Sequence, residues 1–223
     1  MPRVMCVYFP RWSLQRIRRD RPELRDRPFA VTRPVANKGS KVAACCERAA
    51  AHGIRAGMVL AEALAMLPSL ACVEEDVDAD RRALLSLAAW AQRYSPIVGL
   101  EDAIAPTCLY LDITGGTDCF GGEEALVRKA REEFGANGWV TAIALADTIG
   151  AAWAVAHYGR GKIDNYQLTI DNFQLQEADR SSICNCQLSI VNVCLPTYQS
   201  PPCASPPKLW IYSPSSASST SAN

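Results

Sequence analysis

The chain has 223 residues, 49% of them hydrophobic, so it is long enough to bury the core of one large domain or of two small ones. Its 23 lysines and arginines balance its 23 aspartates and glutamates, so the overall charge requires neither a nucleic acid nor a membrane surface as partner. No run reaches the roughly 18 apolar residues of a membrane-spanning helix, and the N-terminus lacks the layout of a signal peptide. These features predict a cytoplasmic protein that makes no contact with a membrane.

The predicted secondary structure alternates between strands and helices as far as residue 158. The long helix among these elements has Asp78 as its predicted N-cap. In chain order, apolar runs and helical periodicity predict a strand at 3–9, a helix at 11–20, strands at 29–33 and 41–45, a helix at 59–67, a long helix at 78–94, strands at 96–100 and 107–112, a helix at 122–134, a strand at 139–145 and a helix at 147–158.

The order of these elements predicts the fold class. When residues 29–77 are set aside, the order is strand, long helix, two strands, helix, strand, which is the split βαβ arrangement of ferredoxin-like folds. We therefore predict an α+β fold in residues 1–160, with 29–77 inserted as a subdomain.

The last part of the chain has a different kind of sequence. The motif Ile-x-Asn-x-Gln-Leu repeats in IDNYQLT, IDNFQLQ and ICNCQLS, and a segment rich in proline and serine follows. Such a sequence cannot bury enough apolar surface to fold alone. We predict that residues 161–223 form a disordered tail derived from a short repeat, either non-native or recently acquired.

The ten cysteines and two histidines do not predict a metal or a catalytic site. The cysteines before the tail lie within apolar segments, and no Cys-x-x-Cys pair is present, so most are expected to be small core residues. Neither His52 nor His157 belongs to a local motif with a nucleophile, so both are predicted to be surface or half-buried residues.

A basic segment follows the first strand. Eight arginines stand between Arg11 and Arg33 against three acids, which is typical either of a solvated helix face or of a phosphate-binding surface. Arg16, Arg18 and Arg19 are the candidates for DNA contact.

The stretch LYLDITGGTDCFGGEEAL raises the question of what Asp112 does. The turn between Gly116 and Gly121 has the spacing of a phosphate-binding loop, but Gly122 and Glu123 stand where lysine and serine or threonine are needed. Asp112 is therefore predicted to end a strand and to hydrogen-bond the glycine turn. A lesser alternative is a catalytic carboxylate set that combines Asp112 with Glu101 and Asp102.

Several blocks together carry a resemblance to a known family. These are RVMCVYFPRWSLQ with RPELRDRPFAVT, KVAACCERAAAHGIRAGMVLAEALAMLPSLACV, RYSPIVGLEDA, LYLDITGGTDCFGGEEAL and ALADTIGAAWAVAHYG. In this order and spacing, residues 3–158 resemble the N-terminal part of Y-family (DinB/UmuC-type) translesion DNA polymerases, and in particular their ImuB-like branch. The resemblance implies a palm subdomain with inserted fingers.

The resemblance also implies that the catalytic site is degenerate. Active members hold two magnesium ions on an aspartate at the end of the first strand and on an Asp-Glu pair before the position of Asp112. Tyr8, Thr107 and Cys108 stand at these three positions. Magnesium needs hard oxygen ligands, which this set does not supply, so the resemblance implies no cofactor, and magnesium only if the protein is active after all.

The positions that grip the incoming triphosphate are altered as well. By the same alignment, Glu47 and Ala50 replace the family's tyrosine and arginine, and Ile149 replaces a lysine. We therefore expect no nucleotide binding at these positions.

ImuB-like proteins are adaptors in damage-induced mutagenesis. The resemblance implies as partners an error-prone replicative polymerase, a RecA-like accessory protein and the sliding clamp, with DNA as a further candidate. The pattern ends near Tyr158, before the thumb, the little finger and any clamp-binding segment. Two alternatives stay open: a fragment or protein-binding module with no role on DNA, and, with less support, an active nucleotidyltransferase.

Overall fold

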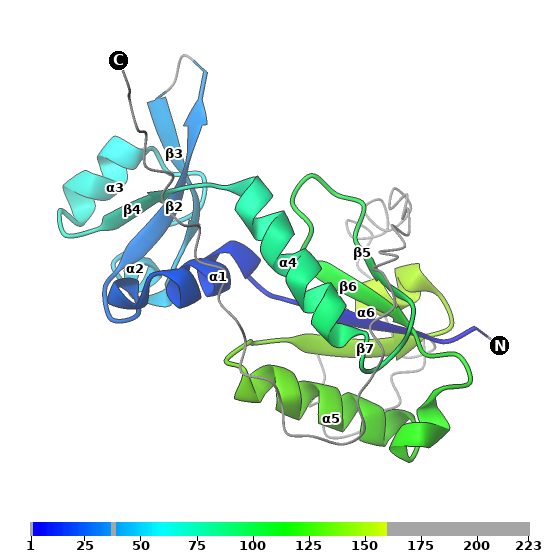
Figure 1. Ribbon diagram of the computed structural model, residues 1–223. Helices are drawn as coiled ribbons and strands as arrows, with labels where there is room; N and C mark the ends of the chain where they lie inside the picture. Colours follow the sequence, from blue (N-terminus) through cyan, green and yellow to red (C-terminus); the bar gives the residue numbers. More distant parts are fainter. Residues whose placement is uncertain (1, 37–38, 160–223) are drawn as a thin grey trace, which may run out of the picture. The chain divides into compact units, whose positions relative to one another are not determined.

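The computed structural model describes residues 2–36 and 39–159, and the predicted tail lies outside these residues (Figure 1). Two sheets and their helices account for the elements. In chain order these are β1 (Val4–Tyr8), α1 (Trp12–Asp20), the 3-10 helix η1 (Pro22–Leu24), β2 (Phe29–Val35), β3 (Gly39–Cys45), α2 (Glu47–Ala51), α3 (Leu60–Met66), β4 (Ala71–Glu74), α4 (Val77–Ala91), β5 (Val98–Leu100), β6 (Cys108–Asp112), the 3-10 helix η2 (Thr117–Phe120), α5 (Glu123–Ala136), β7 (Ala142–Ala146) and α6 (Ile149–Tyr158).

The larger sheet has the strand order β5-β6-β1-β7, and every neighbouring pair is antiparallel. With α4 between β1 and β5 and α5 between β6 and β7, this is the ferredoxin-like arrangement, so the predicted α+β fold is confirmed. Successive side chains along each strand point to opposite faces of the sheet, and apolar residues of β1 and β6 lie on both faces. We call this four-stranded sheet the palm sheet.

The two faces of the palm sheet are covered by different helices. Met5 and Val7 of β1 and Leu109 of β6 pack in one core with residues of α4 and α5. Cys6 of β1 and Cys108 of β6 point to the other face, where they pack with α6. The sequence around both central strands is therefore apolar on both sides, as a doubly covered strand requires.

The long helix α4 begins earlier than its sequence suggests. The carboxylate of Asp76 accepts a hydrogen bond from the backbone N–H of Ala79 at 2.8 Å, so Asp76 and not Asp78 is the N-cap. Both aspartates have the residue type that caps helices, and only the backbone conformation decides between them. The helix ends at Ala91, before the predicted end at residue 94.

The smaller sheet lies in the inserted segment and has the order β3-β2-β4. Strand β2 pairs with β3 in antiparallel fashion and with β4 in parallel fashion. Helices α2 and α3 belong to the same segment. Its core also includes Leu14 and Ile17 of α1, so this core is not confined to the predicted range 29–77.

Helix α1 makes specific contacts with α4. The indole N–H of Trp12 donates to the backbone carbonyl of Asp80 at 2.9 Å, and the guanidinium of Arg16 pairs with the Asp80 carboxylate at 2.5 Å. The side chains of Arg16 and Asp80 are both nearly buried, at 11% and 8% exposed. Within the described part of the chain, no helix combines the length and the apolar character needed to cross a membrane.

Candidate functional site

The three positions that the resemblance assigns to metal-binding carboxylates lie together at one end of the palm sheet. Tyr8, the last residue of β1, is the register partner of Cys108, the first residue of β6. The backbone N–H of Phe9 donates to the carbonyl of Thr107 at 3.0 Å, which extends the pairing by one step. The structure thus brings Tyr8, Thr107 and Cys108 to one place, called the Cys108 end of β6 below.

Aromatic side chains from α6 fill the space beside these residues. The ring of His157 stacks on that of Tyr8 with centroids 3.8 Å apart, and the ring of Trp153 lies 4.1 Å from His157 on the same helix. The Nε2 atom of His157 lies 3.8 Å from the sulfur of Cys108, and its Nδ1 atom lies 2.9 Å from the carbonyl oxygen of Trp153. Helix α6 is therefore fastened to the sheet at this point.

One carboxylate, that of Glu101, lies near this end of the strand, and protein donors hold it. One of its oxygens accepts from the backbone N–H of Thr107 at 3.0 Å and from the hydroxyl of Thr107 at 3.3 Å. The other accepts from the indole N–H of Trp153 at 3.2 Å. These bonds tie the loop before β6 to α6 and leave the carboxylate with a structural role.

Burial and neighbouring groups change the protonation of the side chains here. Burial on its own raises the pKa of the Cys108 thiol, but hydrogen bonds from Cys6 and His157 outweigh it and lower that pKa to about 7. Burial lowers the pKa of His157, but its contacts with Cys108 outweigh this and raise it. Burial raises the pKa of Tyr8, so its phenol stays neutral at physiological pH.

This donor set does not fit magnesium. The ion takes carboxylate, carbonyl and water oxygens in octahedral geometry, whereas the Cys108 end offers a neutral phenol, a hydroxyl and a thiol. In the part of the chain that the structure describes, no group of three or more His, Cys, Asp or Glu side chains is placed to hold a metal ion.

Asp112 lies at the other end of the same strand. Its register partner is Val4, and its side-chain carboxylate accepts a hydrogen bond from the backbone N–H of Thr114 at 3.0 Å. The side chain is exposed and holds the start of the glycine turn, as predicted. The place at which β6 ends in this turn is called the Asp112 end below.

The alternative carboxylate set is wrong. The backbone N–H of Glu101 bonds to the carbonyl of Cys108, so Glu101 and the adjacent Asp102 lie at the Cys108 end. Four residue steps along a strand separate that end from Asp112, a distance of about 13 Å. Carboxylates so far apart do not share a metal ion.

The glycine turn after Asp112 is built for chain reversal and not for phosphate. Gly121 and Gly122 both have positive φ values, 86° and 101°, which only glycine adopts readily. The carboxylate of Glu123, the first residue of α5, pairs with the guanidinium of Arg3 at 2.7 and 2.8 Å. Glycine thus stands where a phosphate-binding loop would carry its lysine, and a carboxylate stands where it would carry serine or threonine.

Two of the three predicted triphosphate positions, Glu47 and Ala50, lie on α2. Glu47 is its first residue and is exposed, with its carboxylate 3.7 Å from the guanidinium of Arg11. Ala50 is exposed and offers no donor from its side chain. Ile149 is the first residue of α6. The three positions, on two different helices, carry one negative charge and two apolar side chains, which do not favour a triphosphate.

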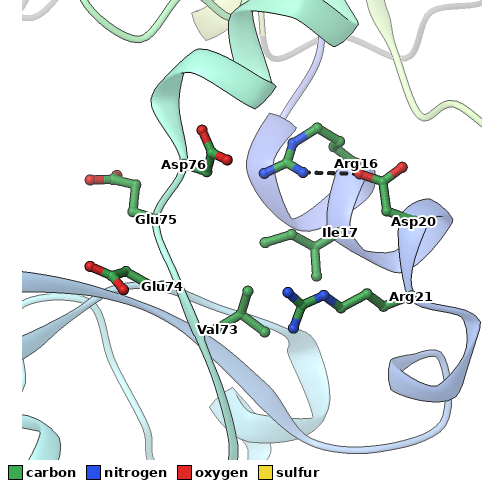
Figure 2. Close-up of a pocket in the computed structure, with 8 residues that line it drawn as sticks. All are labelled: Arg16, Ile17, Asp20, Arg21, Val73, Glu74, Glu75 and Asp76. Atoms are coloured by element: carbon green, nitrogen blue, oxygen red, sulfur yellow. Dashed lines mark hydrogen bonds and ion pairs between the residues drawn. The ribbon is translucent and has the colours of Figure 1, made fainter. Parts of the chain in front are cut away.

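The three candidate arginines for DNA contact are engaged within the protein. Arg16 pairs with Asp80 and, at 2.9 Å, with Asp20 (Figure 2 shows the second pair), so a phosphate would have to displace these carboxylates. The guanidinium of Arg18 lies 5.8 Å from the ring centre of Phe29. Phosphate contact through these side chains stays a prediction.

Arg19 is also used internally. Its guanidinium donates to the carbonyl of Asn137 at 2.7 Å and lies 4.8 Å from the ring centre of Trp139. This side chain therefore helps to dock α1 against the turn that follows α5.

The contribution of α6 to this site is not predicted by the sequence. The sequence predicts His157 to be a surface or half-buried residue and assigns Trp153 and Glu101 no structural role at this site. The available signal was the spacing of Trp153 and His157, which places both rings on one side of a helix. That spacing does not say which strand the rings will meet, because the contact with Tyr8 and Cys108 joins segments far apart in the chain.

Comparison with known proteins identifies a family whose profile this chain matches. Residues 7–157 match the profile of the impB/mucB/samB family, a span that covers more than half of the chain. A segment of 107 residues is 39% identical to Protein ImuB of Caulobacter vibrioides, and one of 118 residues is 28% identical to DNA polymerase IV of Vibrio vulnificus. These segments cover 48% and 52% of this chain but only 23% and 31% of the relatives, so the match spans less than a third of each.

Solved structures show the same fold. Dbh DNA polymerase in an insertion ternary complex superimposes with a TM-score of 0.58 at 19% identity, over 71% of this chain and 46% of that chain. DinB from Sulfolobus solfataricus superimposes with a TM-score of 0.55 at 20% identity, over 70% of this chain and 45% of that chain. At these identities the likeness establishes the fold and nothing beyond it.

Proposed function

This chain belongs to the impB/mucB/samB family of Y-family polymerases, which serves DNA repair and damage tolerance, and on that premise we propose that it is a catalytically inactive member. In this proposal the protein takes part in damage-induced mutagenesis as an adaptor and transfers no nucleotide. Its partners by family resemblance are an error-prone replicative polymerase, a RecA-like accessory protein and the sliding clamp.

The observation that carries the proposal is the composition of the Cys108 end. Nucleotidyl transfer by two metal ions requires carboxylates that hold both ions beside the reacting oxygens. At the corresponding positions Tyr8 and Cys108 face each other across two strands, and the ring of His157 packs on Tyr8. A site lined this way supports a role in docking α6 and does not support metal-dependent catalysis.

The altered triphosphate positions support the same proposal. A single substitution at one ligand would weaken catalysis, but the metal positions and the phosphate-gripping positions are altered together. Glu47 adds a negative charge where a triphosphate would have to lie, and repulsion between like charges disfavours binding. Combined loss is what we expect of a site that selection no longer maintains for chemistry.

A primer-extension assay tests the inactivity. The full chain is incubated with a primed template, the four deoxynucleoside triphosphates, and magnesium or manganese, beside an active Y-family polymerase as positive control. We expect no extension above background. A triple variant, with Tyr8, Thr107 and Cys108 each changed to alanine, reports background from a contaminating polymerase. Extension by the natural chain that the triple variant lacks would overturn the proposal.

A second candidate function is a protein-binding module with no role on DNA. The engagement of Arg16 by Asp80 and of Arg19 by Asn137 favours it, because these cations are already used within the fold. Binding of a fluorescent primer-template across a salt series separates the two functions. A steep fall in affinity with salt, reduced by changing Arg18 and Arg19 to glutamine, supports DNA contact, and no binding at low salt supports the protein-binding module.

A further inference from the structure

Strand β7 forms one edge of the palm sheet (Figure 1). Its inner side pairs with β1, and no strand in the described part of the chain pairs with its outer side. An unpaired strand edge is the place where a sheet accepts a further strand. The proposed inactivity does not explain this edge, because β7 carries none of the residues of the Cys108 end.

Two residues of β7 direct their backbone groups outward. The N–H of Phe9, the residue after β1, bonds to the carbonyl of Thr107, so the odd-numbered residues of β1 bond to β6. The even-numbered residues of β1 therefore bond to β7, where their register partners are residues 142, 144 and 146. Ile143 and Leu145 alternate with these, so their N–H and C=O groups face the open edge.

The other sheet edges in the described part of the chain are protected. The outer side of β3 is covered, since Val42 exchanges backbone hydrogen bonds with Met58 and Gly57 at 2.9 and 2.8 Å. Strands β4 and β5 are short, with four and three residues. Strand β7 has five residues, AIALA, with no proline and no charge to repel an incoming strand.

The sequence of the β7 edge is complementary to itself. When two copies of β7 run antiparallel and meet at Ala144, Ile143 of each copy lies opposite Leu145 of the other, so their outward N–H and C=O groups bond in pairs. Alanines then stand opposite alanines, and Thr141 stands opposite Asp147, so no like charges face each other. A second copy of this chain thus satisfies the edge without a mismatch.

Helix α6 is placed to take part in the same contact. Its sequence, IGAAWAVAHY, contains no Asp, Glu, Lys or Arg, whereas a helix with one side on a sheet and the other in water is amphipathic. The helix packs against β1 and β7 alike, so its axis lies about half a strand spacing, roughly 2.4 Å, inside β7. Pairing of the two edges then brings the two copies of α6 to about 10 Å, a usual distance between packed helices.

We propose that this chain forms a dimer through the β7 edge, in which two palm sheets join into one continuous sheet. The two strands are antiparallel, and the two-fold axis passes beside Ala144. Each α6 packs against the α6 of the other copy. The dimer does not depend on whether the protein binds a metal ion or transfers nucleotides, so its test is separate from that of the proposed inactivity.

Sedimentation velocity of the full chain tests the association. The dimer fraction should rise as the protein concentration is raised from about 1 to about 200 µM, by mass action. Thr141→Glu places a carboxylate opposite Asp147 of the other copy, twice in each dimer, and should weaken the dimer about three- to tenfold, whereas Thr141→Lys should strengthen it by about the same factor. Ser69→Glu and Ser69→Lys, at an exposed position outside the palm sheet, are the matched controls and should leave the association unchanged.

Amide hydrogen exchange, followed by NMR, identifies what covers the edge. The N–H groups of Ile143 and Leu145 should exchange fast in dilute samples and more slowly in concentrated samples, because the second copy protects them.

Three results would overturn the proposal. A monomer at every concentration would leave the edge to a strand of a different protein. A dimer that Thr141→Glu does not weaken would be joined through another surface. Slow exchange of both amides at concentrations at which the chain is monomeric would show that another part of the same chain covers the edge.

Discussion

The two ends of strand β6 differ in every property that decides their function. At the Cys108 end the side chain of Cys108 is fully buried and contacts His157 of α6. At the Asp112 end the side chain is exposed and bonds to the backbone of the next turn. One end of the strand therefore shapes a turn through an exposed acceptor, and the other packs a helix through a buried side chain.

The difference has a physical cause. The bond from Asp112 to the N–H of Thr114 stabilises the turn in any member of the fold, active or not. Carboxylates at Tyr8, Thr107 and Cys108 would stabilise nothing without bound metal, since close negative charges repel each other. The groups present at these positions instead pack against α6, through the ring of Tyr8 on that of His157 and through Cys108.

The largest expected effect comes from placing a carboxylate at the Cys108 end. Cys108→Asp forces a carboxylate, which is larger and more strongly hydrated than a thiolate, into a position that is 0% exposed, and we expect it to lower the free energy of unfolding by about 3 kcal/mol or more. Chemical denaturation measures the change. Cys119→Asp, at an exposed cysteine of η2, is the matched control and should change it by less than about 0.5 kcal/mol. Similar values for both variants would mean that the Cys108 end is open to water.

The next effect concerns the aromatic contact of α6. Trp153→Ala removes a ring that packs on His157 and an N–H that binds Glu101, and we expect a loss of about 2 kcal/mol in the free energy of unfolding. Tyr158→Ala, on the same helix but 40% exposed, should cost less than about 1 kcal/mol. Equal losses in the free energy of unfolding for the two variants would show that Trp153 does not pack at the Cys108 end in the way described.

The lowered pKa of Cys108 predicts a dependence on pH. The folded state favours the thiolate, so this group stabilises the fold above the ordinary thiol pKa of 9.0, and the contribution is lost as pH falls through about 7. The difference in unfolding free energy between the natural chain and Cys108→Ser should therefore grow between about pH 7 and pH 9, by about 2 kcal/mol. Changing the exposed His52 to glutamine should leave this profile as it is. A flat or falling difference would contradict the assigned pKa.

The smallest effect is expected at the Asp112 end. Asp112→Ala removes one exposed acceptor for the N–H of Thr114, so we expect a loss of about 0.5 to 1 kcal/mol, measured by thermal and chemical unfolding. Asp112→Asn keeps an acceptor oxygen and should cost less. A loss above about 3 kcal/mol would show that Asp112 belongs to a buried network, and the contrast between the two ends would disappear.

The sequence predicts the palm sheet well because its signals are local. β1, β6 and α5 have apolar patterns of sufficient length, and the glycines around residue 121 mark a turn by their need for positive φ. Strand β4 was missed because it has four residues, of which only Val73 is buried. Its stability comes from parallel pairing with β2, which no local pattern reveals.

The sequence predicts the positions that form the candidate site but not the side chains that pack against them. The family resemblance identified Tyr8, Thr107 and Cys108, and the register of β1 against β6 brings them together. The contact of these residues with His157 could not be predicted, because His157 lies on α6, a helix far along the chain from β1. The internal use of Arg16 was also missed, because its partner Asp80 lies on α4 and a run of arginines looks alike whether buried or exposed.

If the Cys108 end of β6 holds no metal ion, the two histidines of this chain allow a direct measurement of that property. NMR spectra of the imidazole groups are recorded as manganese is added, because the paramagnetic ion broadens signals close to it. We predict that His157, beside Tyr8 and Cys108, is broadened no more than the exposed His52. Selective broadening of His157, reversed by an excess of magnesium, would show a metal site at this end and contradict the account.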